Sequence, residues 1–173
     1  EAGCQVFIVH ARNAWLQGLS PKENREVPPL NYPLVHRLKR ERSDLQIAIN
    51  GGIASEAAVQ EQLAHVDGVM IGRAAYHDPY LLHCLDRALF APEAPLQTRE
   101  DLLRSLEPHA RALGARGVML KHFSRHILGL FAGQPGGRQF RQILSTEAHR
   151  PEAGWALIER ALAAVELQQA RAA

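Results

Sequence analysis

Two short apolar runs that end in glycine constrain the fold of this chain more than any other feature. The first is Ile-Ala-Ile-Asn-Gly-Gly at residues 47–52, and the second is Val-Met-Ile-Gly-Arg at residues 69–73. Each run has the pattern of a buried parallel strand that leads into a loop. Glycine lets the backbone approach an anion there, and the next helix offers free N–H donors. The runs therefore predict phosphate-binding loops, such as those after strands seven and eight of an eight-stranded α/β barrel.

Residues 5–10 predict a first buried strand, which ends at His10. A lone histidine is more often a structural hydrogen-bonding group than a ligand-binding one. The position of His10 favours the ligand-binding role, because α/β proteins bind their ligands at the carboxyl ends of their strands. We therefore place His10 with the glycines of the other two strands in a candidate site.

A helix is predicted after each of the three strands. The residues that favour a helix start at these places are Asn31, Pro33, Ser55, Asp78 and Pro79. Strands and helices then alternate in the order βαβαβα, which requires a parallel sheet.

The chain becomes wholly helical after a proline-containing linker at residues 91–97. Apolar residues at helical spacing predict helices over residues 98–113 and 118–131, another that begins at Arg138, and a last one over residues 152–170. The second of these has Leu120, Phe123, Ile127 and Leu130 on its apolar side, and the last has Trp155, Ile158, Leu162 and Val165. The expected fold is α/β for residues 1–92, followed by a small helical bundle at residues 93–173.

Basic residues are concentrated in an interval without acidic ones. The net charge is only +2, but residues 108–146 contain no Asp or Glu. The interval contains Arg111, Arg116, Lys121, Arg125, Arg138 and Arg141, with His109, His122 and His126. A polyanion partner and a solvated basic face both explain this asymmetry. Arg138 and Arg141 favour the polyanion, because the first turn of a helix is an unfavourable place for cations.

The connection over residues 13–31 is longer than most loops between a strand and a helix. Because it follows the ligand-binding end of a strand, a functional role is favoured, and Lys22 and Arg25 could contact phosphates.

The cysteines and apolar runs exclude several classes of protein. Cys4 and Cys84 have neither metal-site spacing nor a disulfide framework, which favours a reducing cytoplasm and predicts no metal. No signal peptide or membrane-spanning run is evident. The chain starts with Glu1 almost directly before a strand, so we expect it to be cut inside a larger fold.

Several long motifs resemble the tRNA-dihydrouridine synthases. They are Phe-Ile-Val-His-Ala-Arg at residues 7–12, residues 15–25 with the run Leu-Ser-Pro-Lys-Glu-Asn-Arg, Ile-Asn-Gly-Gly at 49–52, and residues 68–76. The Leu-Ser-Pro-Lys-Glu-Asn-Arg run and Gly-Gly-Arg-Gln-Phe-Arg at residues 136–141 resemble the A subfamily in particular. The resemblance covers nearly the whole chain, but only the latter part of the family's length.

The resemblance implies the C-terminal part of a TIM barrel followed by a helical tRNA-binding domain. It also implies an FMN-dependent oxidoreductase, which reduces uridine to 5,6-dihydrouridine in the D-loop of tRNA, at positions 20 and 20a in the A subfamily. NADPH reduces the flavin, which passes a hydride to C6 of the uracil, while a cysteine protonates C5. The implied flavin-binding residues are His10, Asn50, Gly51, Gly52, Gly72 and Arg73. The implied tRNA-binding residues are Lys22, Arg25, Arg138 and Arg141.

The family's catalytic cysteine and its flavin-contacting lysine are expected upstream of Glu1, so no catalytic residue is assigned here. We expect the chain alone to be inactive and the full-length protein to be a monomer. Two alternatives stay open: a non-catalytic tRNA-binding fragment, and another FMN- or phosphate-binding TIM barrel.

Overall fold

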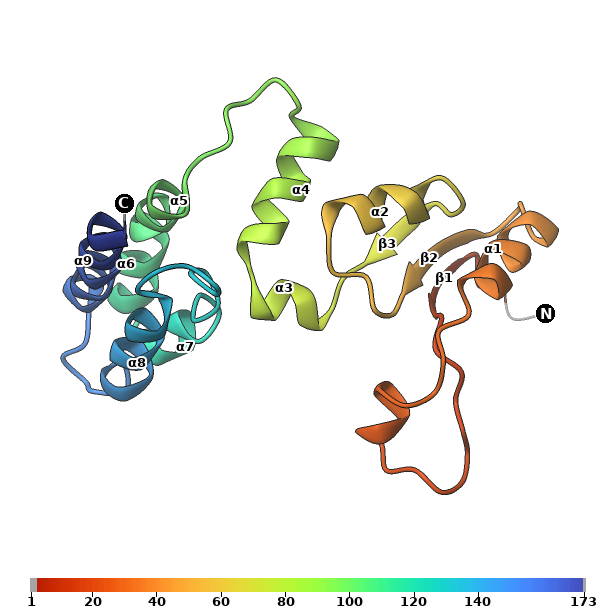
Figure 1. Cartoon of the computed structure of the whole chain (residues 1–173), viewed down its shortest axis with the longest axis horizontal. Coiled ribbons are helices and arrows are strands. Elements are labelled where there is room, and N and C mark those ends of the chain that lie inside the picture. Colours follow the sequence, from red (N-terminus) through yellow and green to blue (C-terminus); the bar gives the residue numbers. More distant parts are fainter. Residues whose placement is uncertain (1–2, 173) are drawn as a thin grey trace. The chain divides into compact units, whose positions relative to one another are not determined.

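The computed structural model describes residues 3–172, which form an α/β arrangement of a small sheet and many helices (Figure 1). The chain divides into two compact units, Glu1–Ala74 and Ala75–Ala173. All strands found in the described residues belong to the first unit. The domain boundary expected between residues 92 and 93 stays a prediction.

The first unit is built on a parallel three-stranded sheet with β2 at its centre. The strands are β1 (Val6–His10), β2 (Gln46–Asn50) and β3 (Gly68–Met70). His10 is aligned with Asn50, and Asn50 is aligned with Met70. The three strands therefore end at the same edge of the sheet, and the predicted parallel pairing is confirmed.

Two helices of the first unit begin at the predicted capping residues. Asn31 accepts a hydrogen bond from the Leu34 N–H at 3.1 Å at the start of α1 (Tyr32–Glu41). Ser55 does the same for the Ala58 N–H at 3.2 Å at the start of α2 (Glu56–Leu63). These bonds satisfy N–H groups that have no partner within a helix. Helix α1 packs against β2 and α2 against β3, and Ile47 and Ile49 of β2 are fully buried.

The prediction that the first strand is buried is wrong. Val6, Phe7 and Ile8 of β1 are 60%, 39% and 63% exposed. Within the described residues, β1 is an edge strand that pairs with β2 alone. Val6 and Ile8 point to the sheet face opposite to Phe7, because side chains alternate along a strand. An apolar run therefore predicts a strand here, but its burial depends on neighbours outside the run.

The second unit contains most of the helices. Helix α3 (Arg73–His77) follows β3 and leads into α4 (Tyr80–Phe90), where Asp78 accepts a hydrogen bond from the Tyr80 N–H at 3.2 Å. After the linker come α5 (Arg99–Ser105), α6 (Glu107–Ala115), α7 (Leu120–Ser124), α8 (Gly137–Glu147) and α9 (Trp155–Ala172). Thr98 caps α5 as predicted, by accepting a hydrogen bond from the Asp101 N–H at 3.1 Å.

Two predicted helices are interrupted in the structure. The helix expected over residues 98–113 is divided into α5 and α6 at Leu106, because Pro108 has no N–H for the Arg104 carbonyl. The helix expected over residues 118–131 ends at Ser124 and continues as turns, for example with the Ile127 N–H donating to Ser124 O at 3.0 Å.

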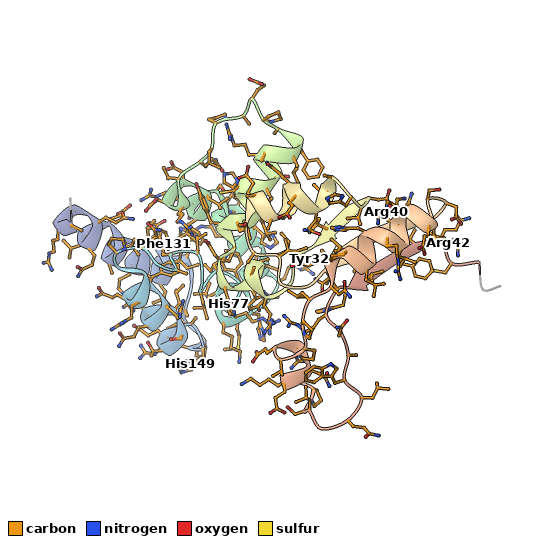
Figure 2. The ribbon with its side chains drawn as sticks, turned by 45° about the vertical axis from the view of Figure 1, so that its right-hand side comes forward. Tyr32, Arg40, Arg42, His77, Phe131 and His149 are labelled. Atoms are coloured by element: carbon orange, nitrogen blue, oxygen red, sulfur yellow. The ribbon has the colours of Figure 1, made fainter. Side chains whose placement is uncertain are left out.

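The core of the second unit includes the predicted apolar residues and several that were not predicted, among them Phe131 and Phe140. Phe131 and Phe140 are fully buried and meet edge to face with their ring centres 4.9 Å apart (Phe131 is labelled in Figure 2). Helices α8 and α9 pack against each other beside them. The eight core positions expected on the second and last predicted helices are all buried, which confirms that helical periodicity identified the core.

Candidate functional site

Polar groups meet where β1, β2 and β3 end. The Asn50 side-chain amide donates a hydrogen bond to Met70 O at 2.7 Å, and the Ala11 N–H donates to Asn50 O at 2.7 Å. His10 is the β1 residue aligned with Asn50. The structure therefore brings together His10 and Asn50, two of the residues expected in the flavin site.

The contacts of His10 define its protonation state. The Arg12 N–H donates a hydrogen bond to His10 Nδ1 at 3.1 Å, so this nitrogen is an acceptor. Although His10 is exposed, its partial desolvation lowers its pKa from the usual value of 6.5, and the nearby charges of Arg12 and Arg73 lower the pKa further. The imidazole is therefore neutral at pH 7, and its hydrogen is on Nε2. His10 offers this Nε2–H as a hydrogen-bond donor.

Gly51 and Gly52 have backbone conformations that other residues rarely adopt, with φ angles of 120° and 71°. A Cβ atom on Gly51 would lie 3.0 Å from Leu30 and 3.1 Å from His10. The Tyr32 hydroxyl fixes this turn by donating a hydrogen bond to Gly51 O at 2.6 Å. Gly72 differs, because a Cβ atom on it would meet no described residue beyond its chain neighbours within 4 Å. Its backbone is open to an approaching group.

Arg73 follows Gly72 and reaches the loop between β1 and α1. Its guanidinium forms an ion pair with Glu26 at 3.1 Å and donates a hydrogen bond to Arg25 O at 3.3 Å. The side chains of Arg73 and Glu26 are 61% and 50% exposed, so the pair is accessible to solvent. Arg73 is therefore a cation beside an open glycine, as a phosphate site requires.

The loop with Lys22 and Arg25 is ordered by its own hydrogen bonds. It contains a short 3₁₀ helix, η1 (Glu23–Arg25). Asn24 clamps the loop by accepting a hydrogen bond from the Trp15 N–H at 3.0 Å and donating one to Trp15 O at 2.8 Å. Lys22 and Arg25 are exposed, and neither has an ion pair with another described residue.

Arg138 and Arg141 lie in the second unit, on α8. Both are exposed, whereas Phe140 and Leu144 on the same helix are buried. Arg104, Arg111 and Arg160 of the second unit form ion pairs with carboxylates. Arg138 and Arg141 have no such pair in the described part of the chain, so their charges are available to an external anion.

Three residues that contact the site were not assigned from the sequence: Arg12, Glu26 and Tyr32. The Arg12 guanidinium donates hydrogen bonds to Glu26 O at 3.1 Å and to Pro28 O, while its buried Nε has no partner among the described residues. Arg12 could have been assigned from the sequence, because it lies two residues after His10 and inside the motif at residues 7–12. Nothing in the sequence marks Glu26 or Tyr32.

Two further classes of site are not found in residues 3–172. The described side chains contain no cluster of three or more His, Cys, Asp and Glu residues suited to a metal ion. None of the described helices has the length and apolar character needed to span a membrane.

Comparisons with known proteins identify the family. The family model described as "Dihydrouridine synthase (Dus)" matches residues 1–168. The chain therefore belongs to the dihydrouridine synthase family, and the resemblance seen in its motifs is confirmed.

Similar proteins are named tRNA-dihydrouridine(20/20a) synthase. The protein of Xanthomonas axonopodis pv. citri is 60% identical over 161 residues, which are 93% of this chain and 48% of the relative. The protein of Xylella fastidiosa (strain 9a5c) is 55% identical over 169 residues, covering 98% of this chain and 49% of the relative. That of Vibrio vulnificus is 48% identical over 165 residues, with coverages of 95% and 51%. The chain thus spans about half the length of the curated relatives it matches.

Proposed function

We propose that this chain is the C-terminal part of an FMN-dependent tRNA-dihydrouridine synthase. In this proposal the three strands belong to the last part of a TIM barrel, and residues 93–173 form a helical tRNA-binding domain. The observation that carries the proposal is the shared edge of the sheet, where His10, Asn50 and Gly51 are adjacent. Arg73 is close enough for its charge to lower the pKa of His10. The names of the relatives support the substrate, which is uridine at positions 20 and 20a of tRNA.

The residues present fit a cofactor that carries a phosphate group. Gly72 leaves its backbone open, and the exposed Arg73 guanidinium has N–H donors suited to a phosphate dianion, which would share them with Glu26 or displace Glu26. When bound, FMN supplies hydride transfer from NADPH to the uracil ring. His10 would contribute a neutral Nε2–H donor that orients the cofactor, and the Asn50 side-chain amide joins the ends of β2 and β3 through its hydrogen bond to Met70 O.

The exposed cations form the tRNA-binding part of the proposal. Lys22 and Arg25 lie on a loop that Arg73 contacts, and Arg138 and Arg141 lie on α8. Such cations bind the phosphate backbone and position an RNA without reading its sequence. The uracil must leave its stack to be reduced, so a synthase needs firm contacts to the surrounding backbone. We further propose that the full-length protein is a cytoplasmic monomer that uses NADPH as reductant.

The first test measures tRNA affinity as a function of salt concentration. The double variant Arg138→Gln/Arg141→Gln is expected to bind unmodified tRNA more weakly, with a slope of log K against log salt that is smaller in magnitude by about 1.4 to 1.8. The control is Arg150→Gln, because Arg150 is an exposed arginine of the same unit that is already paired with Glu147. Unchanged binding by the double variant would contradict tRNA recognition by this surface.

The second test concerns the flavin. The visible absorption spectrum of natively purified protein, followed by heat release, shows whether FMN is bound. Flavin together with uridine reduction supports the synthase. A colourless chain that binds tRNA is the result expected of the non-catalytic alternative, which the uncovered face of β1 favours for this chain by itself.

A further inference from the structure

An exposed aromatic ring is held in place by a polar contact on the second unit. Tyr76 lies on α3, and its side chain is 55% exposed. Its hydroxyl is 3.1 Å from His126 Nδ1, and the two rings meet edge to face with centres 5.6 Å apart. Tyr76 belongs to the motif at residues 68–76, yet it has no assigned role in the proposed flavin site or in tRNA binding.

Arg125 completes a chain of three polar groups. Its Nε–H donates a hydrogen bond to His126 Nε2 at 3.1 Å. Because a guanidinium can only donate, His126 Nε2 is an acceptor and the neutral imidazole has its hydrogen on Nδ1. His126 therefore donates to the Tyr76 oxygen. The hydroxyl hydrogen of Tyr76 stays available to another acceptor, and so do the remaining N–H groups of Arg125.

The backbone behind these side chains is tightly packed. A Cβ atom on Gly129 would lie 2.1 Å from His77 O and 3.1 Å from Tyr76 O, so the turn after α7 lies directly against the end of α3 (His77 is labelled in Figure 2). Ile127 and Leu130 anchor the same turn in the core. The Tyr76 ring is thus positioned before any ligand arrives, which reduces the entropy lost on binding.

Arg125 is flanked along the chain by other exposed basic residues. Arg125, Lys121 and His122 are exposed and lie in the interval without acidic residues. No described carboxylate forms an ion pair with Arg125 or Lys121. An exposed aromatic ring connected through His126 to an arginine without an ion pair among the described residues suits an unpaired nucleobase and its phosphate, because every base can stack and every nucleotide is anionic.

We propose that Tyr76, His126 and Arg125 form a further RNA contact on the second unit. The Tyr76 ring stacks on an unpaired base of the bound tRNA, and Arg125 binds a neighbouring phosphate. His126 positions both side chains. This inference rests on the proposed tRNA binding, but it concerns residues other than the four cations assigned to it above.

The test compares tRNA binding by single variants over a range of salt concentrations. Tyr76→Ala is expected to weaken binding about ten-fold at every salt concentration, because stacking carries no charge. Tyr76→Phe retains the ring and is expected to bind at least about three-fold more tightly than Tyr76→Ala. Arg125→Gln is expected to lower the salt slope by about 0.7 to 0.9. The matched control is Phe90→Ala, because Phe90 is a 79% exposed aromatic residue of the same unit, and this variant should bind like the unmodified chain.

A second measurement uses the chain without substitutions. Ultraviolet crosslinking to tRNA, followed by mass spectrometry, is expected to place a nucleotide adduct on Tyr76. Normal binding by Tyr76→Ala, an equal loss in Phe90→Ala, or adducts confined to other residues would each overturn the inference. If Arg138→Gln/Arg141→Gln loses binding while Tyr76→Ala does not, the inference fails and the proposed function stands. If all of these variants bind normally, the proposed tRNA binding fails as well.

Discussion

The Arg73 guanidinium lies 3.1 Å from the carboxylate of Glu26, although the two residues are 47 positions apart in the chain. The same guanidinium donates to the carbonyl oxygen of Arg25. The cation expected to bind the flavin phosphate is therefore attached to the loop expected to bind tRNA. A phosphate at Arg73 must share this cation with Glu26 or displace it.

Glu26→Gln is expected to increase phosphate affinity. The substitution keeps an oxygen acceptor but removes the competing charge, and an exposed ion pair of this kind is worth about 0.2–1 kcal/mol. Inorganic phosphate should therefore bind up to about five-fold more tightly. Phosphate titrations followed by the amide resonances of Gly72 and Arg73 measure the effect. Glu41→Gln on α1 is the control, and weaker binding by Glu26→Gln would show that Glu26 holds Arg73 in its binding position.

His10 is expected to titrate below pH 6.5 in the folded chain, because burial, Arg12 and Arg73 all lower its pKa. The unfolded chain then binds more protons than the folded chain in this range. The stability contributed by His10 is thus present above pH 6.5 and is lost as the pH falls through its folded pKa. NMR titration of the imidazole gives the midpoint, and its nitrogen shifts should show a protonated Nε2.

A charge variant tests the cause of this pKa shift. Arg73→Gln removes one of the positive charges that lower the pKa of His10, so the midpoint should rise towards 6.5. Arg37→Gln on α1 is the control, since Arg37 is not among the charges that lower the pKa of His10. A midpoint that is the same in both variants would exclude an electrostatic contribution from Arg73.

Gly51→Ala is expected to destabilise the first unit by about 1–3 kcal/mol, because a side chain is strained at a φ of 120°. The added methyl group would also press on Leu30 and His10. Gly72→Ala is the matched control and should change stability by less than about 0.5 kcal/mol, since its Cβ meets nothing within 4 Å. Hydrogen exchange of the β2 amides measures the stability change in both variants. Equal protection in the two variants would contradict the strain argument.

Asn24→Ala removes both hydrogen bonds that clamp the loop to Trp15. We expect faster amide exchange in residues 13–31. At about 0.5–1.5 kcal/mol for each of the two bonds lost, tRNA binding should be weaker by about five- to 150-fold if the ordered loop is the binding form. The salt slope should stay unchanged because no charge is lost, whereas Lys22→Gln should lower it. Gln17→Ala in the same loop is the control. Normal tRNA affinity of Asn24→Ala would show that the loop does not contact the RNA.

The edge on which the candidate site lies was predictable because its signals are local. An apolar run that ends in glycine specifies both a strand and the place where the strand stops, so Asn50 and Gly51 were located correctly at the end of β2. Helical spacing likewise identified Phe123 and Ile158 as core residues. These patterns need no knowledge of the rest of the chain.

Long-range contacts account for what the sequence did not reveal. The ion pair between Glu26 and Arg73 depends on a loop that reaches the end of a distant strand. After α7 the chain forms turns, and Gly129 in these turns packs against the carbonyl of His77. This contact is between residues far apart in the sequence, so local patterns did not predict it. The exposure of Ile8 depends on which segments pack on its face of the sheet, and its own sequence does not reveal this.

The free edge of β1 has a practical consequence for work with this chain. Among residues 3–172 its backbone pairs with β2 alone, and its Val-Phe-Ile sequence is exposed. Such an edge is a template to which a strand from another molecule can add. We therefore expect concentrated solutions to form intermolecular sheets, so the usable concentration range depends on these few residues and not on the well-packed helices that follow.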